Sequence, residues 1–258
     1  MRPALHAEWT KLRTVAGPSW LLLATVALTV ALSALALAGE SYANADAGVD
    51  LPKLSLTGIY LGQAIVAILG VVVIGSEYGF GMIRITLAAV PRRWTVLAAK
   101  AVVVGGLVLA TGTIAVLACL LAGRLILPGH GFTAAHDYAL LSLAHGSTLR
   151  AAAGSVLYLV LIALLSLGVA AAVRSSAAAI GIVLGLLYLF PIIAAVVPYP
   201  HWQRHLQQLA PMTAGLAIEA TTNLRSLPIG PWAGLGVLAA WSTAALLVGG
   251  LVLRLRDG

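Results

Sequence analysis

The sequence predicts an all-α membrane protein with six transmembrane helices. Of the 258 residues, 61% are hydrophobic and only 9% are charged, whereas about a quarter of the residues in a soluble globular chain are charged. Six uncharged apolar runs are each longer than the roughly 20 residues that a helix needs to cross a bilayer. A transmembrane β-barrel would instead show short segments of alternating hydrophobicity.

The six spans form a single transmembrane domain that covers residues 1–258. They are predicted at about 19–38, 58–75, 97–123, 151–173, 177–197 and 232–253. Before the first span, Leu5, Trp9, Leu12 and Val15 share one helical face. Residues 1–18 therefore favour an interfacial helix. The alternative is a polar tail that holds the N-terminus in the cytoplasm.

In the second half of the chain, three residues are expected to interrupt the apolar helices: Arg174, Pro191 and Pro198. Arg174 is the only charge between the fourth and fifth runs, and it marks a tight turn. Pro191 and Pro198 are expected to kink or end the fifth span, since proline removes a backbone donor. The half-apolar segment 199–231 is expected to hold short re-entrant helices that dip into the outer leaflet.

Charge sets the topology, because six spans place both termini on the same side. That side holds ten Lys and Arg residues against three Asp and Glu, and the other side holds five of each. Cytoplasmic loops carry the excess of positive charge, so both termini are predicted to be cytoplasmic. We assign the formal net charge of +7 to this rule and not to nucleic-acid binding.

The cytoplasmic loop at 76–95 carries the most distinctive pattern. Its apolar residues follow helical spacing with Arg84 on the polar side, which predicts a short interfacial helix that ends at Pro91. Glu77 either pairs with Arg84 or Arg92 or docks on a cytoplasmic partner. Lys100, after the loop, is expected to snorkel to the interface as an anchor.

No residues indicate catalysis or a metal site. His201 and His205 are four residues apart, but the chain has no H-E-x-x-H motif, and Cys119 is its single cysteine. It also has no P-loop motif. None of the six predicted spans contains Asp or Glu, which argues against a proton-driven transporter. The chain is therefore predicted not to be an enzyme, and energy for any work would come from a partner.

Four segments resemble the ABC-2 type permeases of ATP-binding-cassette exporters, in their small bacterial form, which looks actinobacterial. These are E-W-T-K-L-R-T at 8–14, S-E-Y-G-F-G-M-I-R-I-T-L-A-A-V-P-R-R at 76–93, Ala99–Lys100, and L-A-P-M-T-A-G at 209–215. The resemblance covers nearly the whole chain and implies the ABC-2 exporter fold, with a cytoplasmic coupling helix and outer re-entrant helices.

The resemblance also implies roles for individual residues. The coupling element that docks on the ATPase would include Glu77, Tyr78, Gly79, Gly81, Met82, Arg84, Pro91, Arg92 and Arg93. A second ATPase contact would involve Glu8, Lys11 and Arg13. An outer gate would contain Pro211, Met212, Gly215 and Glu219.

The expected function is that of a permease subunit in the plasma membrane, which exports an amphiphilic or hydrophobic substrate such as an antibiotic, peptide or lipid. Two cytoplasmic ATPase subunits would bind ATP and magnesium, and this chain would hold no cofactor. A second permease, identical or homologous, would complete the complex within membrane lipid. The alternatives are a non-transporting anchor for an ATPase or sensor, and a membrane metalloenzyme that uses the outer histidines. The sequence leaves the substrate and the direction of transport open.

Overall fold

The computed structural model describes residues 8–10, 16–42, 49–79, 93–136, 138, 141–196 and 199–256. Within these ranges the chain is helical and contains no strand. Six of the described helices are long and apolar enough to cross a membrane. They are α2 (Ala16–Gly39), α4 (Ile59–Gly79), α6 (Arg93–Ile126), α7 (Gly146–Val173), α8 (Ser176–Val196) and α11 (Pro231–Arg256). The predicted all-α architecture is confirmed, and its six long helices are those expected of a multi-pass membrane protein.

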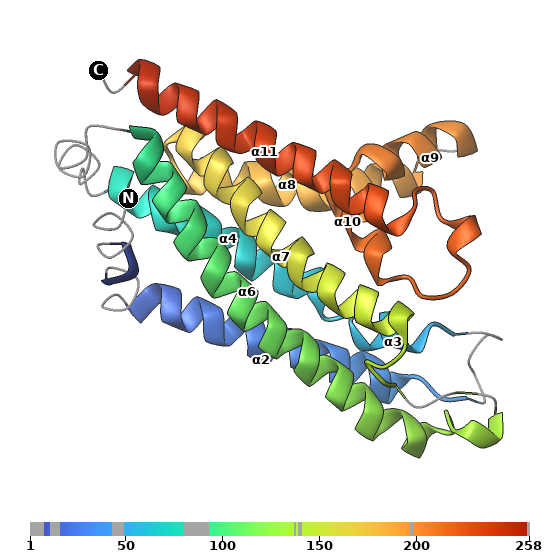
Figure 1. The fold of residues 1–258 in the computed structure, drawn as a ribbon. Helices are drawn as coiled ribbons and strands as arrows, with labels where there is room; N and C mark the ends of the chain where they lie inside the picture. Colours follow the sequence, from blue (N-terminus) through green and yellow to red (C-terminus); the bar gives the residue numbers. More distant parts are fainter. Residues whose placement is uncertain are drawn as a thin grey trace.

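The long helices run side by side and form two distinct ends (Figure 1). At the basal end α4 and α11 finish, α6 begins, and α7 turns into α8. The described short helices that connect the long ones lie at the distal end. α7 lies in the middle and packs against α4, α6, α8 and α11, while α2 packs against α4 and α6. α4 and α7 are therefore the most buried helices, and α2, α8 and α11 expose much of their apolar surface.

Glycine lets the central helices approach until their backbones touch. A Cβ atom on Gly168 of α7 would lie 2.5 Å from the carbonyl carbon of Ala245 on α11. A Cβ atom on Gly249 of α11 would lie 2.6 Å from the carbonyl oxygen of Gly168. Apolar burial does not drive helices together in lipid, so close van der Waals contact of this kind holds them.

Among the described residues, the distal end contains α3 (Leu51–Ser55), α9 (Pro200–Leu209), α10 (Pro211–Leu216) and four short 3-10 helices. The latter are η1 (Leu127–His130), η2 (Ala134–His136), η3 (Ala217–Glu219) and η4 (Leu224–Ser226). Both α9 and α10 begin with proline, whose missing N–H costs nothing in a first helical turn. These two are the short helices predicted in the segment 199–231.

Two predicted breaks can be compared with the structure. Arg174 caps α7 in the left-handed conformation, with φ of 62°, so the tight turn between the fourth and fifth spans is confirmed. Pro191 lies inside α8, which continues to Val196. The fifth span therefore does not end at Pro191, and Pro198 lies outside the described residues.

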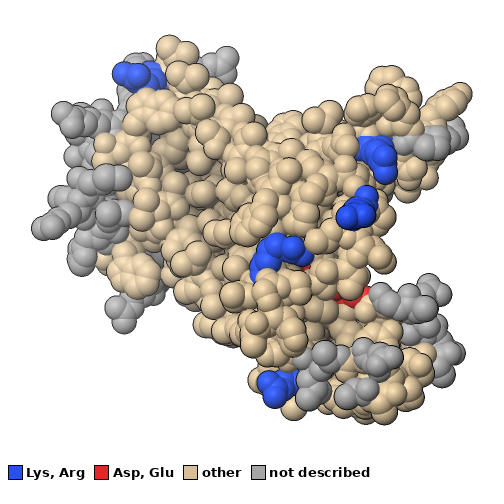
Figure 2. All heavy atoms as spheres, turned by 45° about the vertical axis from the view of Figure 1, so that its right-hand side comes forward, with Lys and Arg blue, Asp and Glu red and all other residues tan. Residues whose placement is uncertain are grey.

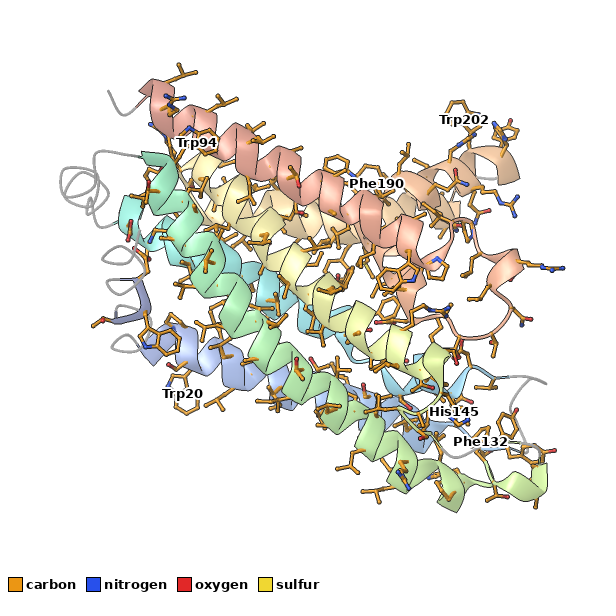
Figure 3. All side chains as sticks on the ribbon, viewed as in Figure 1. Trp20, Trp94, Phe132, His145, Phe190 and Trp202 are labelled. Carbon is orange, nitrogen blue, oxygen red and sulfur yellow. The ribbon has the colours of Figure 1, made fainter. Side chains whose placement is uncertain are left out.

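Tryptophans mark both ends of the bundle. Trp20 and Trp94 lie towards the basal end, and Trp202 lies at the distal end (Figure 3). Trp20 and Trp202 are exposed. Tryptophan prefers the two membrane–water interfaces, so this placement agrees with a bundle that spans a bilayer from end to end.

Candidate functional site

A buried cluster of charge lies at the basal end. The Lys100 ammonium donates to Glu8 Oε2 at 2.7 Å and to Glu77 Oε1 at 2.8 Å. It also approaches the Val73 carbonyl oxygen at 3.4 Å. Lys100 is only 1% exposed, and both carboxylates are buried. We call Glu8, Glu77 and Lys100 the ionic cluster; it joins the N-terminal segment to α4 and α6.

Helix geometry brings these groups together. α4 continues past residue 75, the predicted end of the second span, so Glu77 lies in its last turn. Val73 is one turn earlier on the same helix, and its carbonyl faces the same side as Glu77. Lys100 lies about two turns into α6, which starts at Arg93. The ionic cluster therefore connects the two helices that flank residues 80–92.

The prediction that Lys100 snorkels to the interface is wrong. Its side chain points into the bundle because three acceptors lie there, one for each of its N–H donors: Glu8, Glu77 and the Val73 carbonyl. A buried ammonium without partners would be very costly. Charge-assisted hydrogen bonds to two carboxylates offset that cost, so the interior position replaces the solvated one.

Arg174 forms a second link at the basal end. Its guanidinium lies 5.8 Å from the centre of the Tyr78 ring, which permits a cation–π interaction. Its Nη2 atom also donates to the Val252 carbonyl oxygen of α11 at 3.4 Å. Tyr78 follows Glu77 directly, so the last turn of α4 contacts the N-terminal segment, α6 and the α7–α8 turn.

The predicted coupling residues fall into two groups. Glu77, Tyr78 and Gly79 form the end of α4, and Arg93 begins α6. Gly81, Met82, Arg84, Pro91 and Arg92 lie outside the described residues, as do Lys11 and Arg13. Glu77 therefore binds Lys100, while its two predicted partners, Arg84 and Arg92, are not among the described residues. Sequence reasoning missed the ionic cluster, although a lysine placed inside a helical span is itself a signal that a carboxylate lies nearby.

The four predicted gate residues come together at the distal end. Pro211, Met212 and Gly215 belong to α10, Glu219 ends η3, and all four are buried. A Cβ atom on Gly215 would lie 2.6 Å from the Tyr158 ring of α7 and 3.1 Å from Leu238 of α11. The segment 211–220 therefore inserts between α7 and α11.

An aspartate ties this segment to the other side of the distal end. The Asp50 carboxylate accepts from the backbone N–H of Thr221 at 2.6 Å and of Thr222 at 3.0 Å, and from the Thr221 hydroxyl at 2.6 Å. It also caps α3 by accepting from the Lys53 N–H. An Asp just before a helix is a recognisable cap, but the sequence holds no signal for contacts to residues so far along the chain.

We expect Asp50→Ala to lower the free energy of unfolding by about 1.5–3 kcal/mol, the contribution of hydrogen bonds to a charged group. The substitution leaves the backbone N–H groups of Lys53, Thr221 and Thr222 and the Thr221 hydroxyl without their acceptor. Thermal unfolding of the purified chain in detergent would measure the loss. Glu40→Ala, at the same end, is the matched control and should change stability little; equal stability of the two variants would contradict the role given to Asp50.

The histidines do not gather around a common point. His201 and His205 meet on α9 with their Nε2 atoms 3.1 Å apart, and His136 stacks on Tyr42 with ring centres 4.0 Å apart. In the part of the chain that the structure describes, no three His, Cys, Asp or Glu side chains are grouped as metal ligands. Cys119 is buried in the core.

Charge is sparse on the face turned towards the viewer in Figure 2, where a few Lys and Arg side chains interrupt a largely uncharged surface. No protein-family model matches the chain, and no curated protein matches it. The features of the molecule that bear on function are the ionic cluster, the inserted segment 211–220 and the apolar bundle between them.

Proposed function

We propose that the chain is the membrane-spanning permease subunit of an ATP-binding-cassette exporter of the ABC-2 type, driven by separate cytoplasmic ATPase subunits. The observation that best supports this function is the ionic cluster. Lys100 links Glu77 at the end of α4 to the start of α6, and those two helices flank residues 80–92. A displacement of that connection would thus reach two membrane-spanning helices at once.

The proposed mechanism converts ATP binding into a movement of helices. Two ATPase subunits that bind ATP and magnesium close and shift the docked loop 76–95, and the ionic cluster makes α4 and α6 follow together. α7 packs against both helices and against α11, so the shift reaches the distal segment 211–220. There the outer path opens to an amphiphilic or hydrophobic substrate, between this permease and a second one.

The burial of the two carboxylates refines their roles. Glu8 and Glu77 are each less than 5% exposed and bind Lys100. We therefore assign them to positioning the loop and not to touching the ATPase. Contacts with the ATPase surface are assigned to the basic residues of the loop, Arg84, Arg92 and Arg93, with Lys11 and Arg13 as a second patch.

Co-purification tests this proposal. The tagged full-length chain is isolated from its native membranes in mild detergent, and the ATP hydrolysis that accompanies it is measured. We expect the wild-type chain to carry ATPase activity, and the double variant Arg92→Glu/Arg93→Glu to lose most of it because reversed charge repels the partner. Arg204→Glu/Arg225→Glu, which reverses two exposed charges of the distal end, is the control and should retain the activity.

Two results would contradict the proposal. The first is a wild-type chain that carries no ATPase. The second is equal activity on the wild-type chain and on the Arg92→Glu/Arg93→Glu variant, which would mean that the loop does not hold the partner.

A further inference from the structure

Glu219 is a buried acid at the distal end. The side chain is fully buried at the end of η3. Its Oε1 atom accepts from the Ser155 hydroxyl of α7 at 3.3 Å. Its Oε2 atom is buried as well and has no hydrogen-bond partner among the described residues. One acidic oxygen thus lies inside the protein without a hydrogen-bond donor among the described residues.

The charged and titratable groups around Glu219 come from several elements. Asp50 and Lys53, at α3, interact electrostatically with Glu219. Three further groups also interact with its charge: Tyr60 of α4, Cys119 of α6 and Tyr158 of α7. Arg150 of α7 donates to the neighbouring Ala220 carbonyl at 2.6 Å. The charged residues of α11, Arg254 and Arg256, lie in its last turn at the opposite end.

None of the described cations pairs with Glu219. Lys53 acts on Glu219 only through its electric field. The salt bridges among the described residues are the two that Lys100 forms with Glu8 and Glu77. A carboxylate that is buried without a counter-charge is strongly disfavoured, and such a group takes up a proton instead. Protonation also gives the group a hydrogen-bond donor in place of a bare negative oxygen.

We propose that Glu219 is a proton-binding site of the distal end: it is neutral while the segment 211–220 is seated between α7 and α11, and it ionises when that segment leaves the bundle. On release the O–H bond breaks and the proton passes to water. On reseating, the carboxylate takes one proton back. The proposal goes beyond the permease function and needs no partner chain.

The direction of the pH dependence follows from linkage. Burial raises the pKa of Glu219 from 4.5 to about 8, while the Ser155 hydrogen bond and the field of Lys53 act in the opposite sense. The seated state binds more protons than the released one, so low pH favours it. This preference is complete below pH 4.5, falls as the pH rises towards about 8, and does not fall further above that value. Within this window the ratio of seated to released chains changes by up to about tenfold per pH unit.

Infrared spectroscopy of the full chain in lipid nanodiscs reads the proton directly. The C=O stretch of a protonated carboxyl group is followed as the pH rises from about 5 to about 9, a range in which ordinary surface carboxylates are already ionised. We expect a band that disappears near pH 8, is absent at every pH from Glu219→Gln, and is unchanged in the control Glu40→Gln. Gln resembles the neutral acid in shape and can still accept from Ser155, so the variant should fold.

A second variant and a second measurement make the test stricter. Ser155→Ala removes a donor that lowers the pKa of Glu219, so the band should persist to higher pH. Hydrogen–deuterium exchange of residues 211–222, corrected for the chemical rate, should increase with pH in the wild-type chain and stay level in Glu219→Gln.

Any of three results would overturn the proposal. They are a Glu219→Gln variant that keeps the full band, a wild-type band that is already absent near pH 6, two units below the expected midpoint, or an exchange rate that does not depend on pH. All of these measurements use the isolated chain, so their failure would leave the question of an ATPase partner untouched.

Discussion

Lys100→Met should lower the free energy of unfolding by about 3–5 kcal/mol, the range seen when one member of a buried ion pair is removed. Met fills a similar volume but cannot donate to the carboxylates of Glu8 and Glu77, which now lie 2.7 and 2.8 Å from the ammonium. Chemical denaturation in mixed micelles would measure the loss. Glu77→Gln is the matched variant; we expect a smaller loss from it, since the bond between Lys100 and Glu8 survives.

The triple variant Lys100→Met/Glu77→Gln/Glu8→Gln separates charge from packing. Removing all three charges together leaves none of the three buried without its described partner, so we expect most of the stability lost in Lys100→Met to return. Either of two results would show that the ionic cluster does not stabilise the basal end. They are a Lys100→Met variant as stable as the wild-type chain, and a triple variant less stable than Lys100→Met.

Gly168→Leu is expected to have the second largest effect on stability. Overpacking a well-packed interior typically lowers the free energy of unfolding by about 1–3 kcal/mol. We expect the upper end of this range here, because the new side chain would clash with backbone atoms. A Cβ atom at Gly168 would lie 2.5 Å from both the carbonyl carbon of Ala245 and the amide nitrogen of Leu246. Neither atom can move aside as a flexible side chain could, so α7 and α11 would have to separate.

Gly106→Leu of α6 is the control for this change. Gly106 is exposed, and the described structure leaves open space where its Cβ atom would be. Both variants replace Gly by Leu inside a helix, so the change in helix propensity is the same. The difference between their melting temperatures in detergent therefore reports only the contact between α7 and α11. Similar melting temperatures for the two variants would contradict the close contact of α7 with α11.

The helices could be predicted from sequence because a bilayer leaves few alternatives. A segment in hydrocarbon must satisfy its own backbone hydrogen bonds and present apolar side chains, and both demands are visible in uncharged runs. The limits of the helices were less certain, since a helix can continue past the hydrocarbon. α4 carries Glu77 in its last turn for this reason, beyond the predicted end at residue 75.

The site was predictable only in part. The charged loop was recognisable as a pattern along the chain, and the resemblance to ABC-2 permeases pointed to the residues proposed as an outer gate. The ionic cluster was not, because Glu8 and Lys100 are 92 positions apart and a lysine near a helix end fits snorkelling equally well. The burial of Glu219 was hidden too, because it depends on how deeply the segment 211–220 inserts between α7 and α11.

The proposed function requires the basal end, with the ionic cluster, to face the cytosol, where ATP is available. The most direct measurement is the labelling of single cysteines in intact cells with a membrane-impermeant maleimide. Thr86→Cys places a cysteine in the loop 76–95, and Ser226→Cys places one at an exposed distal position. The native Cys119 is the only other cysteine and is buried. We predict that Ser226→Cys is labelled in intact cells and that Thr86→Cys reacts only after the membrane is opened; the reverse pattern would contradict the proposed function.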